Sequence, residues 1–125
     1  MRIRIDPMNE VPIYRQITEQ VRHMILSGQM EAHEKLPSSR NLGLELKVNM
    51  LTVQKAYKEL REEGLICNRR GEGSFVQDQQ SIGPVARTLE IKKELESVVN
   101  KARLYGLSHE EVVQLLKNIE KENQS

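Results

Sequence analysis

Apolar residues recur every three or four positions over residues 13–27, which predicts an amphipathic helix. The members of this stripe are Ile13, Ile17, Val21, Met24 and Ile25. Pro12 suits the first turn of such a helix, because its missing N–H would be unpaired there anyway. Gly28 is a typical stop, since glycine enters the left-handed conformation without strain. We therefore expect a helix from about residue 13 to residue 27.

Two shorter helices are predicted next, over residues 38–46 and 49–63, with a tight connection between them. The apolar side chains are Leu42, Leu44 and Leu46 in the first, and Val53, Ala56, Tyr57 and Leu60 in the second. Ser38 and Asn49 can cap these helices, because their side chains accept hydrogen bonds from unpaired backbone N–H groups. Because Tyr57 belongs to this apolar stripe, we expect it to be a core residue. Taken alone, such a pair is also typical of a hairpin within a helical bundle.

A β-hairpin follows the helix pair, because the strand-like runs "LICN" and "SFVQ" flank a polar, glycine-rich turn. The turn consists of Arg69, Arg70, Gly71, Glu72 and Gly73. Helix, helix, turn, helix and hairpin is the order of a winged helix-turn-helix, in which residues 49–63 are the recognition helix and the hairpin is the wing. We predict a mainly α fold with a small β-hairpin wing, formed by residues 1–77.

Residues 78–125 are predicted to form a linker and a two-helix dimerisation tail. After the polar stretch "DQQSIGPV", apolar residues recur at a coiled-coil-like spacing until Gly106 interrupts them, and Ser108 and Glu111 can form a capping box for a last helix. Two amphipathic helices cannot close a core alone, so they must pack on the first domain or on a second copy; we favour the second copy. The expected dimer residues are Ile91, Leu95, Val98, Ala102, Leu115, Leu116 and Ile119.

Composition leaves the function open but narrows the class. The net charge is +1, with 19 basic and 18 acidic side chains, so binding to an anionic polymer requires the charges to be sorted by face. The single cysteine, Cys67, excludes an internal disulfide and is expected to be a small buried side chain. The three histidines lack metal-ligand spacing, and no catalytic pairing or phosphate loop is evident, so we expect no enzyme and no cofactor. With no signal peptide and no membrane-spanning stretch, we expect a cytoplasmic protein.

Residues 12–76 resemble the DNA-binding domain of the GntR family of bacterial transcription factors. The resemblance rests on a helix opening Pro-Ile-Tyr, the loop Leu-Pro-Ser-Ser-Arg, a recognition helix ending Glu-Gly-Leu-Ile, and Arg-Arg-Gly-x-Gly-x-Phe-Val, in fixed order. The short helical tail is similar to that of the YtrA subfamily, where the tail serves dimerisation. The resemblance implies a sequence-specific transcriptional regulator, a repressor acting as a homodimer on a pseudo-palindromic operator in double-stranded DNA.

The resemblance also implies where DNA is contacted. Arg40 would reach DNA from the start of the second helix, and Gly71 would lie at the tip of a wing in the minor groove. The full set of expected DNA-binding residues is Ser38, Ser39, Arg40, Asn49, Met50, Thr52, Arg69, Arg70 and Gly71. Helix N-termini favour phosphate, and the first residues of a recognition helix are those that reach base edges, so both arguments agree on placement.

Two departures from the family pattern affect the expected specificity. Relatives commonly have arginine where this chain has Met50, and methionine cannot make the bidentate contact to guanine, so we expect weaker or A·T-biased readout with more of the recognition at Arg40. Met50 or Leu51 could instead pack inward. Glu72 in the wing would be repelled by phosphate, so it either points outward or pairs with a neighbouring arginine. Arg69 could also pair with Glu62, and a winged-helix module that binds protein instead of DNA remains the alternative function.

Overall fold

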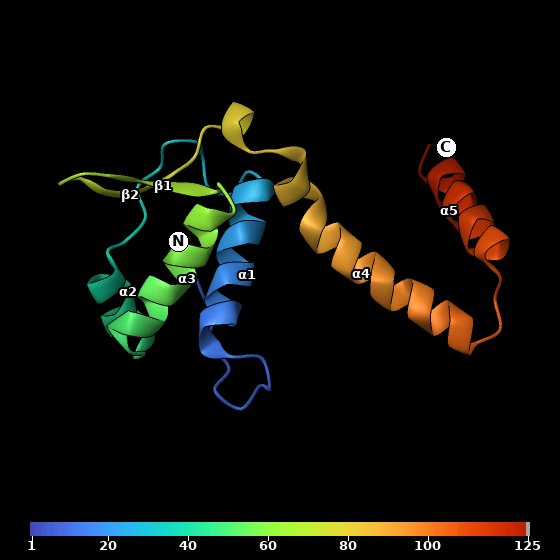
Figure 1. Cartoon of the computed structure of the whole chain (residues 1–125), viewed down its shortest axis with the longest axis horizontal. Coiled ribbons are helices and arrows are strands. Elements are labelled where there is room, and N and C mark those ends of the chain that lie inside the picture. The colour runs from blue at the N-terminus through green and yellow to red at the C-terminus, as the bar shows by residue number, and fades with distance from the viewer. Residues whose placement is uncertain (125) are drawn as a thin grey trace. The chain divides into compact units, whose positions relative to one another are not determined.

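The predicted order of helices and hairpin is confirmed (Figure 1). A computed structural model describes residues 1–124, without the side chains of residues 79 and 85. The elements are α1 (Ile13–Leu26), α2 (Ser39–Leu46), α3 (Met50–Glu62), β1 (Ile66–Arg69), β2 (Gly73–Val76), the 3₁₀ turn η1 (Gln79–Ser81), α4 (Pro84–Leu104) and α5 (His109–Gln124). The fold is mainly helical, with a two-stranded antiparallel hairpin directly after the helix-turn-helix.

The chain forms two compact units, of which the first is Met1–Arg87 and the second begins at Thr88. Ile82 and Ala86 belong to the core of the first unit, so this unit extends past the boundary expected at residue 77. Part of the stretch that the sequence presented as a polar linker is helical, because α4 already begins at Pro84. Proline is well tolerated in a first helical turn.

The core of the first unit lies where α1 and α2 pack against α3. Its fully buried side chains include Ile17, Val21, Ile25, Leu36, Leu42, Val53, Leu60, Leu65, Ile66 and Val76. Most of these belong to the apolar stripes of the three helices and to the inward face of the hairpin, while Leu36 and Leu65 lie in connecting segments. Burying each large aliphatic side chain is worth roughly 1.5–3 kcal/mol. The helix-turn-helix is therefore held rigidly enough to present a fixed surface.

The wing has a third, short edge that the sequence did not indicate. Residues 33–36 lie along β2, where the N–H of Leu36 donates to the carbonyl of Ser74 at 2.9 Å and the N–H of Val76 donates to that of Glu34 at 2.8 Å. An isolated bridge pairs Lys35 with Phe75. β2 is therefore paired on both sides, and the outer edges of this small sheet are β1 and the segment 33–36.

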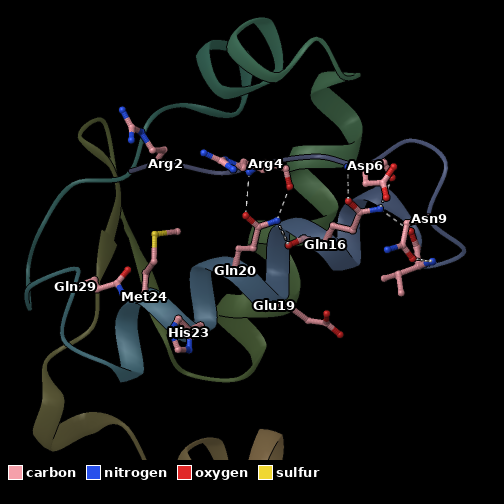
Figure 2. Close-up of a pocket in the computed structure, with 11 residues that line it drawn as sticks. Arg2, Arg4, Asp6, Asn9, Gln16, Glu19, Gln20, His23, Met24 and Gln29 are labelled. Atoms are coloured by element: carbon pink, nitrogen blue, oxygen red, sulfur yellow. Dashed lines mark hydrogen bonds between the residues drawn. The ribbon is translucent and has the colours of Figure 1, made fainter.

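An N-terminal arm is fastened to α1 by two glutamines one helical turn apart (Figure 2). The side-chain amide of Gln20 both accepts from the N–H of Arg4, at 2.9 Å, and donates to its carbonyl, at 2.7 Å. Gln16 does the same for Asp6, at 2.9 and 3.0 Å. Four helical residues rise about 6 Å and two extended residues about 6.6 Å, so the two periods match. Ile3 is thereby held in the core.

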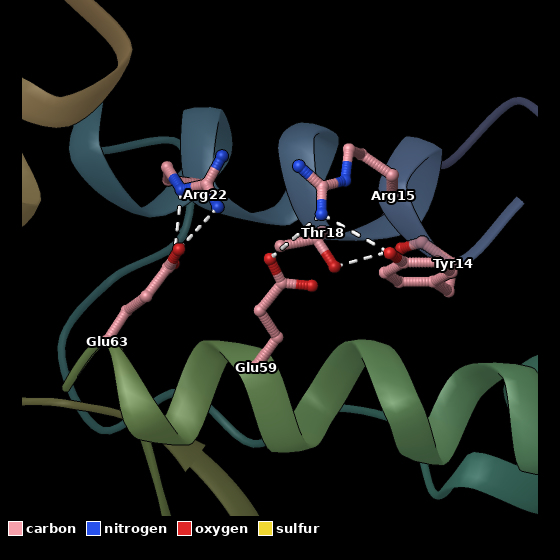
Figure 3. A network of polar contacts seen from close by, with 6 residues as sticks. All are labelled: Tyr14, Arg15, Thr18, Arg22, Glu59 and Glu63. Atoms are coloured by element: carbon pink, nitrogen blue, oxygen red, sulfur yellow. Dashed lines mark hydrogen bonds and ion pairs between the residues drawn. The ribbon is translucent and has the colours of Figure 1, made fainter. Parts of the chain in front are cut away.

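Ion pairs tie α1 to α3 along their length (Figure 3). Arg22 is 3% exposed and donates from Nε and Nη2 to the two carboxylate oxygens of Glu63, at 3.1 and 2.6 Å. Arg15 lies 3.8 Å from Glu59 and donates to the hydroxyl of Tyr14 at 3.2 Å. A bidentate, largely desolvated pair is geometrically specific. It fixes the C-terminal end of α3 against α1.

The second unit contains most of α4 and all of α5, and it leaves many apolar side chains in solvent. Those exposed on the two helices include Ile91, Leu95, Val98, Val99, Leu104, Leu115, Leu116 and Ile119. Ala102 is buried, at 8% exposure. The capping box is confirmed, because Ser108 and Glu111 each accept from the other's backbone N–H, at 3.2 and 3.3 Å.

Candidate nucleic-acid interface

The N-terminus of α2 is capped as predicted, and it presents Arg40 to solvent. Ser38 Oγ accepts from the N–H of Asn41 at 3.0 Å, while Ser39 opens the helix with its side chain half-buried. Arg40 is exposed and makes no ion pair with any residue from 1 to 124. Unpaired N–H groups at a helix start and a free guanidinium are both suited to phosphate and base edges.

The start of α3 carries the other predicted contacts. Asn49 caps the helix, its Oδ1 accepting from the N–H of Leu51 at 2.8 Å. Met50 is 41% and Leu51 64% exposed, so neither packs inward as filler, and Thr52 is half-buried. The N-terminus of α3 therefore presents two apolar side chains and one hydroxyl to a binding partner.

The turn between α2 and α3 depends on one very close backbone approach. A Cβ on Gly43 would lie 3.0 Å from the carbonyl oxygen of Val48 and 3.4 Å from the Cα of Met50. Lys47 takes the left-handed conformation, with φ of 58°, and the N–H of Val48 donates back to the carbonyl of Gly43 at 2.9 Å. The missing side chain of Gly43 is what lets the recognition helix start so near α2.

A groove of about 560 Å³ between α3 and the wing is lined by basic side chains that the motifs in the sequence do not include. Its lining includes Leu51, Gln54, Lys55, Lys58 and Arg61 from α3, with Asn68 and Ser74 from the wing. The sequence does contain a pattern that indicates these basic residues. Residues 55, 58 and 61 are three positions apart, which puts them on one face of a helix. That face lies beside the buried stripe of α3, where solvent-exposed residues are expected.

Tyr57 is buried as predicted and anchors α3 to the loop before α2. Its hydroxyl donates to the carbonyl of Pro37 at 2.7 Å, and the side chain is 2% exposed. Burial, aided by the nearby carboxylate of Glu45, raises the pKa of Tyr57. The hydroxyl therefore stays neutral and remains a donor, which holds Ser38 in register with the recognition helix.

The wing tip is a tight turn in which the N–H of Glu72 donates to the carbonyl of Arg69 at 2.9 Å. Gly71 has φ of +78°, the conformation that many β-turns require at their third position. Arg70 is exposed in this turn, and the described part of the chain offers it no ion pair; the same holds for Glu72. The alternative in which Arg69 pairs with Glu72 or Glu62 is not seen among the described residues.

Arg69 instead contacts two aromatic rings. Its guanidinium lies 4.1 Å from the centroid of Phe75, and Nη2 donates to Nδ1 of His33 at 3.1 Å. Of the nine residues expected at DNA, Arg69 is thus the one whose charged group is already occupied within the protein. The other eight lie at the start of α2, the start of α3 or the wing tip.

The model of the bacterial regulatory proteins of the gntR family matches residues 13–76, which span all three interface elements. The chain belongs to the GntR family. It is therefore a DNA-binding transcriptional regulator and not an enzyme. No group of histidine, cysteine and acidic side chains within residues 1–124 could hold a metal ion, and no helix in that range is long and apolar enough to cross a bilayer.

Two similar proteins match this chain beyond the DNA-binding domain, and a third covers a shorter part of it. The HTH-type transcriptional repressor YtrA of Bacillus subtilis is 36% identical over 118 residues, covering 94% of this chain and 91% of the relative. A GntR family transcriptional regulator from Listeria monocytogenes has a TM-score of 0.72 at 31% identity, covering 91% of this chain and 98% of that one. AraR(DBD) in complex with operator ORX1 has a TM-score of 0.51 at 30% identity, covering 58% and 89%.

Proposed function

We propose that this GntR regulator is a repressor that binds a pseudo-palindromic operator as a homodimer. The observation that carries the proposal is the exposed apolar surface of α4 and α5, which lies on the same chain as a complete winged helix-turn-helix. The similarity to the repressor YtrA extends over both the winged helix-turn-helix and the helical tail, and it supports repression over activation.

On DNA, α3 enters the major groove with its N-terminus leading. Arg40, at the start of α2, reaches a base edge in the same groove, and the serines beside it bind phosphate through hydroxyl and backbone N–H groups. Lys58 and Arg61 line the groove between α3 and the wing and add contacts to phosphate, whereas the ammonium of Lys55, in the same lining, lies 4.0 Å from the centroid of the Tyr14 ring. The wing tip follows the adjacent minor groove.

Met50 sets the base preference of the first recognition position. It is exposed at the tip of α3, where an arginine would bind the O6 and N7 atoms of guanine. A methionine offers only apolar contact, which suits the methyl group of thymine. The operator is therefore richer in A·T pairs at this position, and Arg40 carries more of the discrimination.

The tail brings two such domains together. The apolar residues of α4 and α5 that are exposed in one chain become buried against those of a second, and each large aliphatic side chain contributes roughly 1.5–3 kcal/mol. A hollow of about 260 Å³ lined by Val98, Ala102, Leu115 and Ile119, among others, receives side chains of the partner. A two-fold dimer would then bind two DNA half-sites whose centres lie about one helical turn, or roughly 10 bp, apart.

Selection of bound sequences from random duplex DNA tests the proposal as a whole. We expect a dyad with half-site centres about 10 bp apart and A·T enrichment opposite Met50. Enriched sites without any dyad would overturn the homodimer on DNA. Absence of enrichment, with binding insensitive to salt, would favour the protein-interaction module instead, since phosphate contacts make affinity fall steeply as salt rises.

A further inference from the structure

The two faces of the wing carry different side chains, because neighbouring residues of a strand alternate between faces. Asn68 and Ser74 are paired in register, and they line the groove toward α3. Cys67 is paired with Phe75 and therefore lies on the opposite side, which we call the outer face. Arg69 follows Cys67 by two positions and shares that face.

On the outer face, the side chain of Arg69 runs away from the tip. Phe75, on which it stacks, lies opposite Cys67, two positions nearer the base of the hairpin than Arg69 itself. The ring of His33 accepts the hydrogen bond from Arg69, and the backbone N–H of His33 donates to the carbonyl of Val76, one step nearer the base still. A guanidinium can only donate, so Nδ1 of His33 is the acceptor in this hydrogen bond. To reach a phosphate beyond the tip, Arg69 would have to break both contacts.

The side chain of Lys35 runs in the opposite direction along the same face. Its backbone bridges Phe75, yet its Cε lies 3.2 Å, and its Nζ 4.0 Å, from where a Cβ on Gly73 would be. Gly73 pairs with Arg69 at the tip end of the hairpin. The ammonium group of Lys35 therefore points toward the tip, and its side chain lies over Gly73, where the absence of a Cβ leaves room for it. Lys35 is exposed and has no ion-pair partner in the described part of the chain.

We propose that the DNA-contacting cations of the wing are Arg70 and Lys35, and that Arg69 is a positioning residue that braces the hairpin through His33 and Phe75. The inference rests on the proposed docking of the wing on DNA. Lys35 comes from the loop before α2, so this loop joins the phosphate-binding surface. Arg70 then contributes a positive charge to DNA binding, whereas Arg69 stabilises the conformation of the hairpin.

The slope of log affinity against log salt separates the two roles, because each lost phosphate contact flattens it by about 0.9. The full-length variants Lys35→Ala and Arg70→Ala, titrated against operator duplex at several salt concentrations, should each lose about 1.8 in slope per dimer, one contact in each of two wings. The matched control is Lys93→Ala, which removes an exposed lysine from α4 and should leave the slope unchanged. A Lys35→Ala slope equal to that of the control would overturn the role of Lys35.

Arg69 is tested by two neutral substitutes. Arg69→Ala should weaken binding equally at every salt concentration and leave the slope as in the wild type. Arg69→Gln keeps the aliphatic stem on the outer face without a charge, so its slope should also match the wild type and its loss of affinity should be smaller than that of Arg69→Ala. If either variant flattens the slope, Arg69 contacts phosphate and the inference is wrong. Failure of the proposed function itself would look different, since the wild type would then show neither an operator nor a salt slope.

Discussion

Arg40 is the residue in which charge, exposure and placement coincide. It projects from the first turn of α2 without an ion-pair partner among the described residues, while the next helix presents two apolar side chains, Met50 and Leu51, at its start. An apolar pair can exclude a wrong base by shape but cannot supply a hydrogen bond to the right one. We therefore expect most of the hydrogen-bonded discrimination to come from Arg40, because its guanidinium presents a fork of donors beside these two side chains.

Replacing Arg40 by alanine should cost about 1–3 kcal/mol in operator binding and relax the preference at one base pair in each half-site. The measurement is a titration of wild type and variant against the operator and against duplexes with single base changes. Lys93→Ala again serves as the control for loss of a positive charge. An Arg40→Ala chain that keeps the full base preference would show that recognition lies elsewhere.

Tyr57 shows how a single hydroxyl keeps the interface in shape. Tyr57→Phe leaves the carbonyl of Pro37 without its 2.7 Å donor, which should lower the free energy of unfolding by about 1–3 kcal/mol in urea denaturation. Since burial raises the pKa of Tyr57, the wild type should also lose stability as the pH rises above about 10, the value for an unfolded tyrosine. The Tyr57→Phe chain should lack this part of the alkaline loss; identical pH profiles would contradict the assignment.

At the scale of elements, the helices and the hairpin could be predicted because their signals are local. Periodic apolar residues, the caps Ser38 and Asn49, and the glycine turn of the wing each act within a few residues of chain. The third edge of the wing could not be found in this way, since residues 33–36 pair with a strand about forty positions later. The engagement of Arg69 by His33 was missed for the same reason.

Gly43 is the element-level feature with the clearest consequence. In an ordinary helix, alanine is about 1 kcal/mol more favourable than glycine. Here the added Cβ would meet the backbone of Val48 at 3.0 Å, so α2 and α3 must move apart. Gly43→Ala should therefore lower the free energy of unfolding by about 1–3 kcal/mol and weaken operator binding.

The matched control for Gly43→Ala is Gly83→Ala. No atom lies within 4 Å of a Cβ built on Gly83, so the change in unfolding free energy should stay within about 1 kcal/mol. Both chains are compared by urea denaturation and by titration of the operator. A stabilised Gly43→Ala protein with unchanged DNA affinity would show that the turn has room for a side chain.

At the scale of the whole molecule, the two units have opposite balances of buried and exposed apolar surface. The first unit encloses a core that extends to Ala86, whereas α4 and α5 expose most of their large apolar side chains. A soluble chain rarely leaves such a surface open unless a partner covers it. If two chains associate through α4 and α5 as proposed, we expect the tail to set the distance between operator half-sites, while the first unit makes the DNA contacts.

Leu95→Glu places a carboxylate on the predicted seam of the tail, at a side chain that is 43% exposed in the single chain. A buried charge without a partner costs more than several apolar contacts can return, so the variant should be monomeric at micromolar concentration by light scattering. Operator affinity should fall with it, because the two half-sites are no longer bound by one assembly. Asn100→Glu adds the same charge to an exposed position of the same helix and should remain dimeric. A chain shortened to end at Arg87 lacks most of α4 and all of α5 but keeps Ile82 and Ala86 in the core of the first unit. This shortened chain should also be a monomer. If the shortened chain and Leu95→Glu both stay dimeric, the apolar faces of α4 and α5 are covered in some other way.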